Sequence, residues 1–278
     1  MSGQYSPRGF SVLPPVVKHL LILNGLFFLA TLTFAGAFNF DLSQYMALHY
    51  PASDKFSPYQ YVTYMFMHAN FAHIFFNMFA LWMFGYALEN IWGSQRFLIY
   101  YIVTGLGAAF IQTFVNYLEF SSIQSAIDSY TNSPDPEAFA LLMRENFEGM
   151  YNHSAVNEFI RNFRQNPGDT ALLQRSYEIA DMFYQKKIST PTVGASGAVY
   201  GILLAFGMIF PNVLIYIYFL FPIKAKYLVM FLGGIELYTG IASNPGDNVA
   251  HFAHLGGMIF GYVMIRMWKN KTNQNRFF

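Results

Sequence analysis

A serine between glycines and a distant histidine are the residues of this chain best suited to covalent chemistry. Ser196 lies between Gly194 and Gly197, so the backbone can approach closely and the hydroxyl is unobstructed. A serine hydroxyl is a weak nucleophile until a base removes its proton, and neutral histidine is the usual base near pH 7. His254 is a candidate for that base. On its own, Gly-x-Ser-Gly is more often a helix-packing motif with an incidental serine.

A second polar cluster opens the apolar stretch that begins near residue 71. His73 and Asn77 are four residues apart and therefore share one face of a helix. Ordinary hydrogen bonding between helices is one interpretation of the pair. Polar side chains inside a membrane helix are costly, however, so each is a functional hypothesis by default. Both side chains can donate hydrogen bonds, and together they could stabilise an oxyanion formed at Ser196.

The composition places these residues in a membrane protein. Of the 278 residues, 54% are hydrophobic and 11% are charged, against roughly 25% charged in an average soluble domain. Ten acidic and six basic residues lie within 118–190, so the rest of the chain has too little polar surface to dissolve in water. A soluble globular enzyme is thereby excluded. The net charge of +1 gives no basic surface for nucleic acid, and the lack of cysteine excludes disulfides and Cys-ligated zinc.

Six apolar stretches approach the length of about 20 residues that a membrane-spanning helix needs. They are Leu20–Phe38, Phe71–Leu88, Phe97–Tyr117, Val193–Phe210, Tyr227–Ile241 and Val249–Trp268. Lys18 and Ala35-Gly36-Ala37 around the first stretch also resemble a cleavable signal peptide, but its length favours a span. The sequence therefore predicts an all-α integral membrane protein with six transmembrane helices.

The basic residues set the predicted orientation. With the N-terminus inside, only Lys55 lies in a short outer loop. The inner flanks carry Arg8, Lys18, Arg96, Lys224, Lys226, Arg266, Lys269, Lys271 and Arg276. By the positive-inside rule, we expect a multi-pass protein with cytoplasmic tails at 1–14 and 271–278. We expect its membrane to be a bacterial inner (plasma) membrane.

The polar segment 118–190 separates two membrane parts, 15–117 and 191–270. Asp135-Pro136-Glu137 has the pattern of a helix start and is followed by a helical run to Gly149. Further helices are predicted at Ser154–Arg164 and Asp169–Lys187, with a turn at Asn166-Pro167-Gly168 between them. We expect an extracytoplasmic helical insertion between the third and fourth spans.

Small residues recur every four positions on two of the spans. The stripes are Gly197, Gly201 and Ala205 on the fourth span and Ala253, Gly257 and Gly261 on the sixth. Small-residue stripes let helix backbones approach closely in membranes. Packing of the two stripes against each other would bring His254 to Ser196.

In these motifs, the chain resembles the rhomboid intramembrane serine proteases over residues 15–117 and 191–278. Gly194-Ala195-Ser196-Gly197 matches the Gly-x-Ser-Gly motif of the family, and Ala253-His254-Leu255-Gly256-Gly257 matches its Ala-His-x-x-Gly motif. The pattern His-x(4)-His-x(3)-Asn falls on His68, His73 and Asn77.

The resemblance implies a six-helix bundle and a serine endopeptidase that cleaves transmembrane segments of single-span or other membrane proteins in the lipid bilayer. It implies that Ser196 is the nucleophile and His254 the general base, as a Ser–His dyad without the acid of a triad. His73 and Asn77 would stabilise the oxyanion together with the Ser196 N–H. Tyr200 would stack on the imidazole, and His68 would support the first outer loop through hydrogen bonds. No cofactor or metal is expected. His251 is expected near the outer surface, where it would either support the catalytic residues or face water.

Two alternatives and two departures from the family stay open, one departure being that the insertion 118–190 lies outside the family core. The chain could be a rhomboid-like pseudoprotease that binds membrane clients without cleavage. It could also be a His-based metal-dependent membrane enzyme or transporter that uses His68, His73, His251 and His254, although no His-Glu-x-x-His occurs. Many family members carry Trp-Arg where this chain has Tyr59-Gln60, which leaves the anchoring of the first outer loop open. Residues 243–247 are expected to form a flexible cap between the last two spans.

Overall fold

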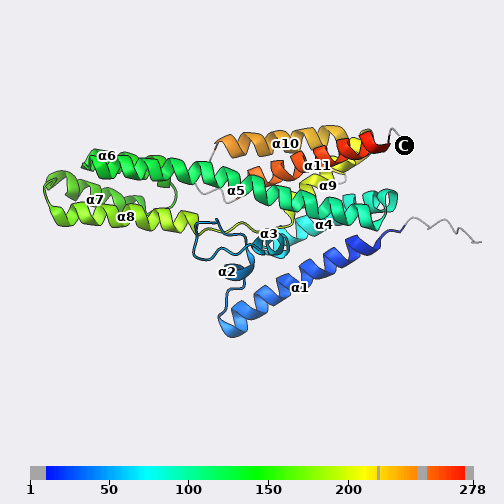
Figure 1. Ribbon diagram of the computed structural model, residues 1–278, viewed down its shortest axis with the longest axis horizontal. Coiled ribbons are helices and arrows are strands. Elements are labelled where there is room, and N and C mark those ends of the chain that lie inside the picture. Colours follow the sequence, from blue (N-terminus) through cyan, green and yellow to red (C-terminus); the bar gives the residue numbers. More distant parts are fainter. Residues whose placement is uncertain (1–10, 218–219, 243–248, 273–278) are drawn as a thin grey trace, which may run out of the picture.

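The computed structural model describes residues 11–217, 220–242 and 249–272, which are mostly helical (Figure 1). The elements are α1 (Pro15–Phe38), α2 (Ser43–Met46), α3 (Gln60–Thr63), the 3₁₀ helix η1 (Tyr64–Phe66), α4 (Phe71–Trp92), α5 (Ser94–Asn132), α6 (Pro136–Phe147), α7 (His153–Gln165), α8 (Thr170–Ile188), α9 (Ser196–Ile209), β1 (Leu214–Ile217), β2 (Phe221–Lys224), α10 (Ala225–Ala242) and α11 (His251–Thr272). The expected cap at 243–247 and the tails before residue 11 and after residue 272 lie outside the described residues.

Six of these helices correspond to the predicted spans, namely α1, α4, α5, α9, α10 and α11. Within the described ranges, three helices (α1, α4 and α5) are long and apolar enough to cross a membrane by length and composition, and α9 is a shorter apolar helix. The helix α1 begins at Pro15, five residues before the predicted start, because proline suits the first helical position.

The helix α9 begins at Ser196, not at Val193 as predicted. The preceding chain is held extended by two hydrogen bonds that pair Leu48 with Thr192, with N–O distances of 2.9 and 2.8 Å. With 14 residues, α9 is roughly 21 Å long, shorter than the hydrocarbon core of about 30 Å. Its first residue therefore need not lie at a membrane surface.

The helix that holds the third predicted span continues beyond Tyr117, the predicted end of that span. The helix α5 runs without interruption for 39 residues to Asn132, a length of roughly 58 Å. Residues 118–132 are polar but contain no glycine or proline, so the change in polarity does not interrupt the backbone hydrogen bonds. The polar insertion is therefore continuous with α5 on its N-terminal side.

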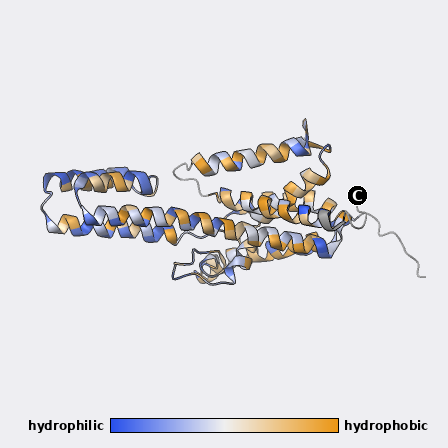
Figure 2. Ribbon diagram, turned by 45° about the horizontal axis from the view of Figure 1, so that its top comes forward, coloured by the Kyte–Doolittle hydropathy of each residue, from blue (hydrophilic) through white to orange (hydrophobic). Residues whose placement is uncertain are grey.

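The three helices predicted within the insertion are present as α6, α7 and α8. Each helix is capped at its N-terminus by a side chain that accepts hydrogen bonds from backbone N–H groups of the first turn. The capping residues are Asp135, Asn152 and Asp169. They gather around the distal part of α5 at one end of the molecule (Figure 1). Their shared core is separate from the main one and contains Phe139, Phe147 and Phe163 among others. Hydrophilic residues are frequent on this end and sparse over the other helices (Figure 2).

A short hairpin that the sequence did not predict joins α9 to α10. The strands β1 and β2 pair antiparallel, with Leu214 opposite Lys224. The main core lies between α4, α5, α9 and α11, and two of its buried tyrosines have backbone partners. The Tyr64 hydroxyl donates to the Gly105 carbonyl at 2.7 Å, and the Tyr100 hydroxyl donates to the Gly201 carbonyl at 2.8 Å.

Candidate active site

Ser196 follows directly on a turn that requires glycine. Gly194 has a φ of 123°, which side-chain-bearing residues rarely adopt. Its N–H donates to the Tyr64 carbonyl at 2.9 Å. A Cβ atom at this position would lie 2.8 Å from the His73 ring. The absence of a side chain at 194 thus lets the first turn of α9 and the first turn of α4 come into contact.

The contact between α9 and α11 is made through their glycines, as the two small-residue stripes predict. A Cβ on Gly257 would lie 1.8 Å from the Gly197 carbonyl oxygen, and a Cβ on Gly261 would lie 3.4 Å from the Gly201 Cα. This backbone contact sets the buried ring of His254 beside Ser196. The distance from His254 Nε2 to Ser196 Oγ is 2.7 Å, within the range for a general base and a nucleophile.

Tyr200 lies one turn after Ser196 and stacks on the His254 ring. The ring centroids are 4.3 Å apart and the planes differ by 8°. The stacking holds the imidazole plane parallel to the phenol, so that the edge carrying Nε2 faces Ser196.

His73 and Asn77 lie on the face of α4 that borders the turn at Gly194. The N–H of Ala69 points at His73 Nδ1, with an N–N distance of 3.4 Å, which favours the tautomer with hydrogen on Nε2. That Nε2 atom is the one next to Gly194. Asn77 is buried, and its Nδ2 donor has no partner among the described residues. Asn70 caps α4 by accepting the His73 N–H at 2.9 Å.

His68 is buried in the loop before α4. Its ring meets the His73 ring at an angle of 67°, with a centroid distance of 5.0 Å. Burial, with a smaller contribution from His73, lowers the pKa of His68 to about 4. The ring is therefore neutral at pH 7 and provides shape and packing beneath the loop.

Comparison with known proteins identifies the family. The Rhomboid domain matches residues 55–127 and 171–270, which is more than half of the chain. The chain belongs to the rhomboid family. Membership implies a multi-pass helical membrane fold, in agreement with the three long apolar helices. The match omits 128–170, the central part of the predicted insertion, but includes both ends of that insertion.

Two curated relatives are similar to this rhomboid. One is the rhomboid protease AarA of Providencia stuartii, 34% identical over 71 residues, which are 26% of this chain and 25% of AarA. The other is an uncharacterized mitochondrial rhomboid protein, P4H10.10, of Schizosaccharomyces pombe, 24% identical over 217 residues. That match covers 75% of this chain and 51% of the yeast protein. The chain thus spans between a quarter and about half of the length of these relatives.

A carboxylate that the sequence analysis missed lies beside His254 in this rhomboid. Glu236 of α10 is buried, and its Oε2 is 2.9 Å from His254 Nδ1. Its Oε1 accepts the Tyr200 hydroxyl hydrogen. The resemblance implied a Ser–His dyad with no carboxylate beside the histidine, whereas the structure has Glu236 next to His254. The signal in the sequence was a single acidic residue within the apolar stretch Tyr227–Ile241.

His251 shares the same carboxylate. Its Nδ1 is 2.6 Å from Glu236 Oε2 and 3.0 Å from Thr239 Oγ1. His251 is the first residue of α11, and only 13% of its side chain is exposed, so that it supports the carboxylate and does not face open water. Ligand atoms of Glu236, His251 and His254 all lie within 4.8 Å of one another, a spacing that could also hold a metal ion.

Gln60 anchors the loop whose support was left open. The side chain is fully buried, whereas Tyr59 is 52% exposed. Its amide nitrogen donates to the carbonyls of Tyr45 and Lys55 at 3.0 and 2.8 Å. Its amide oxygen accepts the N–H groups of His49 and Ser57, both at 3.2 Å. A neutral amide thus serves as both donor and acceptor for the loop between α2 and α3.

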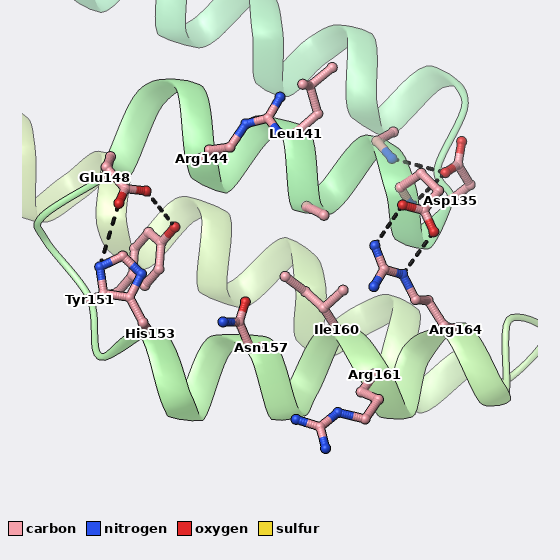
Figure 3. A pocket seen from close by; sticks show the side chains of 13 residues that line it. Asp135, Leu141, Arg144, Glu148, Tyr151, His153, Asn157, Ile160, Arg161 and Arg164 are labelled. Carbon is pink, nitrogen blue, oxygen red and sulfur yellow. Dashed lines mark hydrogen bonds and ion pairs between the residues drawn. The ribbon is translucent and has the colours of Figure 1, made fainter.

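A groove in the insertion lies between α6 and α7 (Figure 3). At one end Arg164 pairs with both carboxylate oxygens of Glu137, at 2.8 and 2.7 Å. At the other end Glu148 accepts from the Tyr151 hydroxyl at 3.0 Å and lies 3.5 Å from His153. None of the residues predicted for catalysis lines this groove.

Proposed function

We propose that this rhomboid is an intramembrane serine endopeptidase that cleaves transmembrane segments of membrane proteins. The observation that carries the proposal is the 2.7 Å contact between Ser196 Oγ and His254 Nε2, in a buried setting between two helices that belong to the family core. AarA, a relative over a quarter of its length, is named a rhomboid protease.

In the proposed reaction, Ser196 Oγ attacks the scissile carbonyl while His254 Nε2 takes its proton. The imidazolium then gives that proton to the leaving amine. Water, with the same histidine as base, releases the acyl group and regenerates the serine.

His73 Nε2, Asn77 Nδ2 and the Ser196 N–H would donate to the oxyanion. The unpartnered, buried Asn77 amide supports this assignment, because a buried donor without an acceptor is costly. His73→Ala and Asn77→Ala should each lower turnover by about 10²–10³-fold while leaving Ser196 open to covalent labelling. Unchanged turnover in both variants and in the double variant would remove the oxyanion assignment.

The proposed topology has six spans, with both termini in the cytoplasm and the insertion 118–190 on the outer side. The distribution of lysine and arginine in the short flanks supports it. Ser196 would then lie at the outer end of α9, where water can reach it. We place the protein in a bacterial inner membrane, with single-span or other transmembrane proteins as substrates.

The test is covalent labelling by a fluorophosphonate, together with cleavage of a panel of single-span proteins. Wild type should be labelled and should cleave some members, whereas Ser196→Ala and His254→Ala should do neither while keeping the wild-type thermal unfolding profile. Near-normal cleavage by either variant would refute the assignment.

Two other functions give different results in the same assays. A pseudoprotease would bind panel members but would show neither cleavage of them nor labelling of Ser196. A metal-dependent protein using Glu236, His251 and His254 would lose its activity on treatment with a chelator. The serine protease should be insensitive to chelation.

A further inference from the structure

Glu236 is the only acidic residue within α9, α10 and α11. Only 8% of its side chain is exposed, and it lies among apolar helices. A carboxylate in such a place is costly unless it is paired, and ionisable groups inside membrane helices mark functional positions by default. The partners of this carboxylate are the two neighbours of the proposed nucleophile, Tyr200 and His254, together with His251.

The carboxylate lies on the side of the His254 ring away from Ser196. Nε2 faces the serine at 2.7 Å, and Nδ1 faces Glu236 Oε2 at 2.9 Å. An acid on Nδ1 selects the tautomer with hydrogen there and leaves the Nε2 lone pair for the serine proton. The Nδ1–Oε2 contact is close but off the line of an ideal hydrogen bond, and catalytic hydrogen bonds often tighten only when substrate binds.

We propose that Glu236 is a positioning residue that converts the expected dyad into a Ser196–His254–Glu236 triad. The proposal rests on the proposed protease function. The proton transfers of the proposed reaction balance within the triad and the substrate. The serine proton moves to Nε2, the imidazolium keeps its Nδ1–H toward Oε2, and the proton leaves with the amine. Glu236 stays ionised throughout.

The same carboxylate also fixes the stacking partner of the base. Oε1 holds the Tyr200 hydroxyl, and the Tyr200 ring stacks on His254 at 4.3 Å. One side chain on α10 therefore restrains the edge of the imidazole directly and its face through the phenol. His251 supplies a second donor to Oε2, which helps to keep the carboxylate in place.

A structural tie between helices is the competing explanation, and the chain offers a matched control for it. Glu89 on α4 is also a buried carboxylate, and it accepts the Val16 and Val17 N–H groups at 2.9 and 2.8 Å. It contacts none of the proposed catalytic residues. Glu89→Gln should lower thermal stability without changing the pH dependence of labelling.

The first experiment measures fluorophosphonate labelling and kcat and KM for a cleaved substrate, against pH, in wild type, Glu236→Gln, Glu236→Asp and Glu89→Gln. We expect Glu236→Gln to lower kcat by about 10²–10⁴-fold with little change in KM, and Glu236→Asp to restore part of the loss. The groups facing His254 are Glu236, His251, His73 and Tyr200. Removing the one carboxylate disfavours the imidazolium, so the acidic limb of the profile should move to lower pH.

The second experiment does not depend on a folded variant. In wild type labelled with ¹⁵N-histidine, the phosphonate adduct should show a strongly downfield Nδ1–H proton from His254. Absence of that proton, or Glu236→Gln labelling within threefold of wild type with an unshifted limb, would overturn the triad. Loss of activity on chelation would overturn it in favour of a metal site. If wild type itself were not labelled, the proposed protease function would fail, which is a different result from a labelled wild type with an equally labelled Glu236→Gln.

Discussion

A single methyl group at position 257 tests the packing that brings Ser196 and His254 together. In Gly257→Ala the new Cβ would meet the Gly197 carbonyl oxygen at 1.8 Å, whereas ordinary contact begins at 3.4 Å. The two helices must therefore separate locally by about 1.6 Å, because packed interiors have no spare volume. His254 lies one turn before this contact, so its 2.7 Å distance to Ser196 would exceed about 4 Å and leave hydrogen-bond reach.

A misplacement of about 1 Å can cost 10²-fold in rate, so we expect labelling of Ser196 by a fluorophosphonate to slow by at least about 100-fold. The matched control is Gly25→Ala on α1, where a Cβ meets nothing within 4 Å. This variant should label normally, and its stability should rise slightly, since alanine favours a helix by about 1 kcal/mol over glycine. Wild-type labelling by a folded Gly257→Ala protein would refute the argument that this glycine contact sets the Ser–His distance.

Three further predictions concern the loop, the buried histidine and the insertion. Gln60→Ala should lower the free energy of unfolding by about 2–4 kcal/mol, because it leaves buried loop groups unpaired, while Tyr59→Ala should change it by less than about 0.5 kcal/mol; chemical denaturation in detergent measures both. Burial lowers the pKa of His68 from 6.5 to about 4, so the fold favours the neutral ring. Wild type should lose up to about 3 kcal/mol as the pH falls from 6.5 to 4 and nothing above 6.5. His68→Gln should flatten that part of the stability curve, and an unchanged slope would contradict the assignment. Replacing 120–188 by a Gly/Ser linker should preserve phosphonate labelling of Ser196 and change the ranking of cleaved substrates; a correctly inserted but unlabelled protein would show that the insertion belongs to the active enzyme.

The sequence was most informative where a local pattern determines the structure. The helix α6 begins after the Asp135 cap, as predicted. The stripes that contain Gly197 and Gly257 face each other, as predicted, because small residues let the two helix backbones approach closely. The continuation of α5 past residue 118 was not predicted, because a change in polarity does not end a helix. The partners of Glu236 were invisible for a different reason. They lie on two other helices, and only tertiary packing brings them together.

The uninterrupted helix α5 connects the two ends of the molecule mechanically. It contains no glycine or proline after Gly107, so it has no built-in hinge over the roughly 37 Å that separate Gly107 from Asn132. Near Gly107 it is in close contact with the core, because a Cβ there would lie 2.2 Å from Phe260, and the next residue, Ala108, borders Gly197.

A tilt of α5 by about 10° about this point would sweep its far end through roughly 6 Å, given the helix rise. The reverse also holds. A force applied to the insertion is transmitted along α5 to the part of that helix that borders the first turn of α9. Because α5 is stiff, movement of the insertion is coupled to the spacing of the helices behind Ser196.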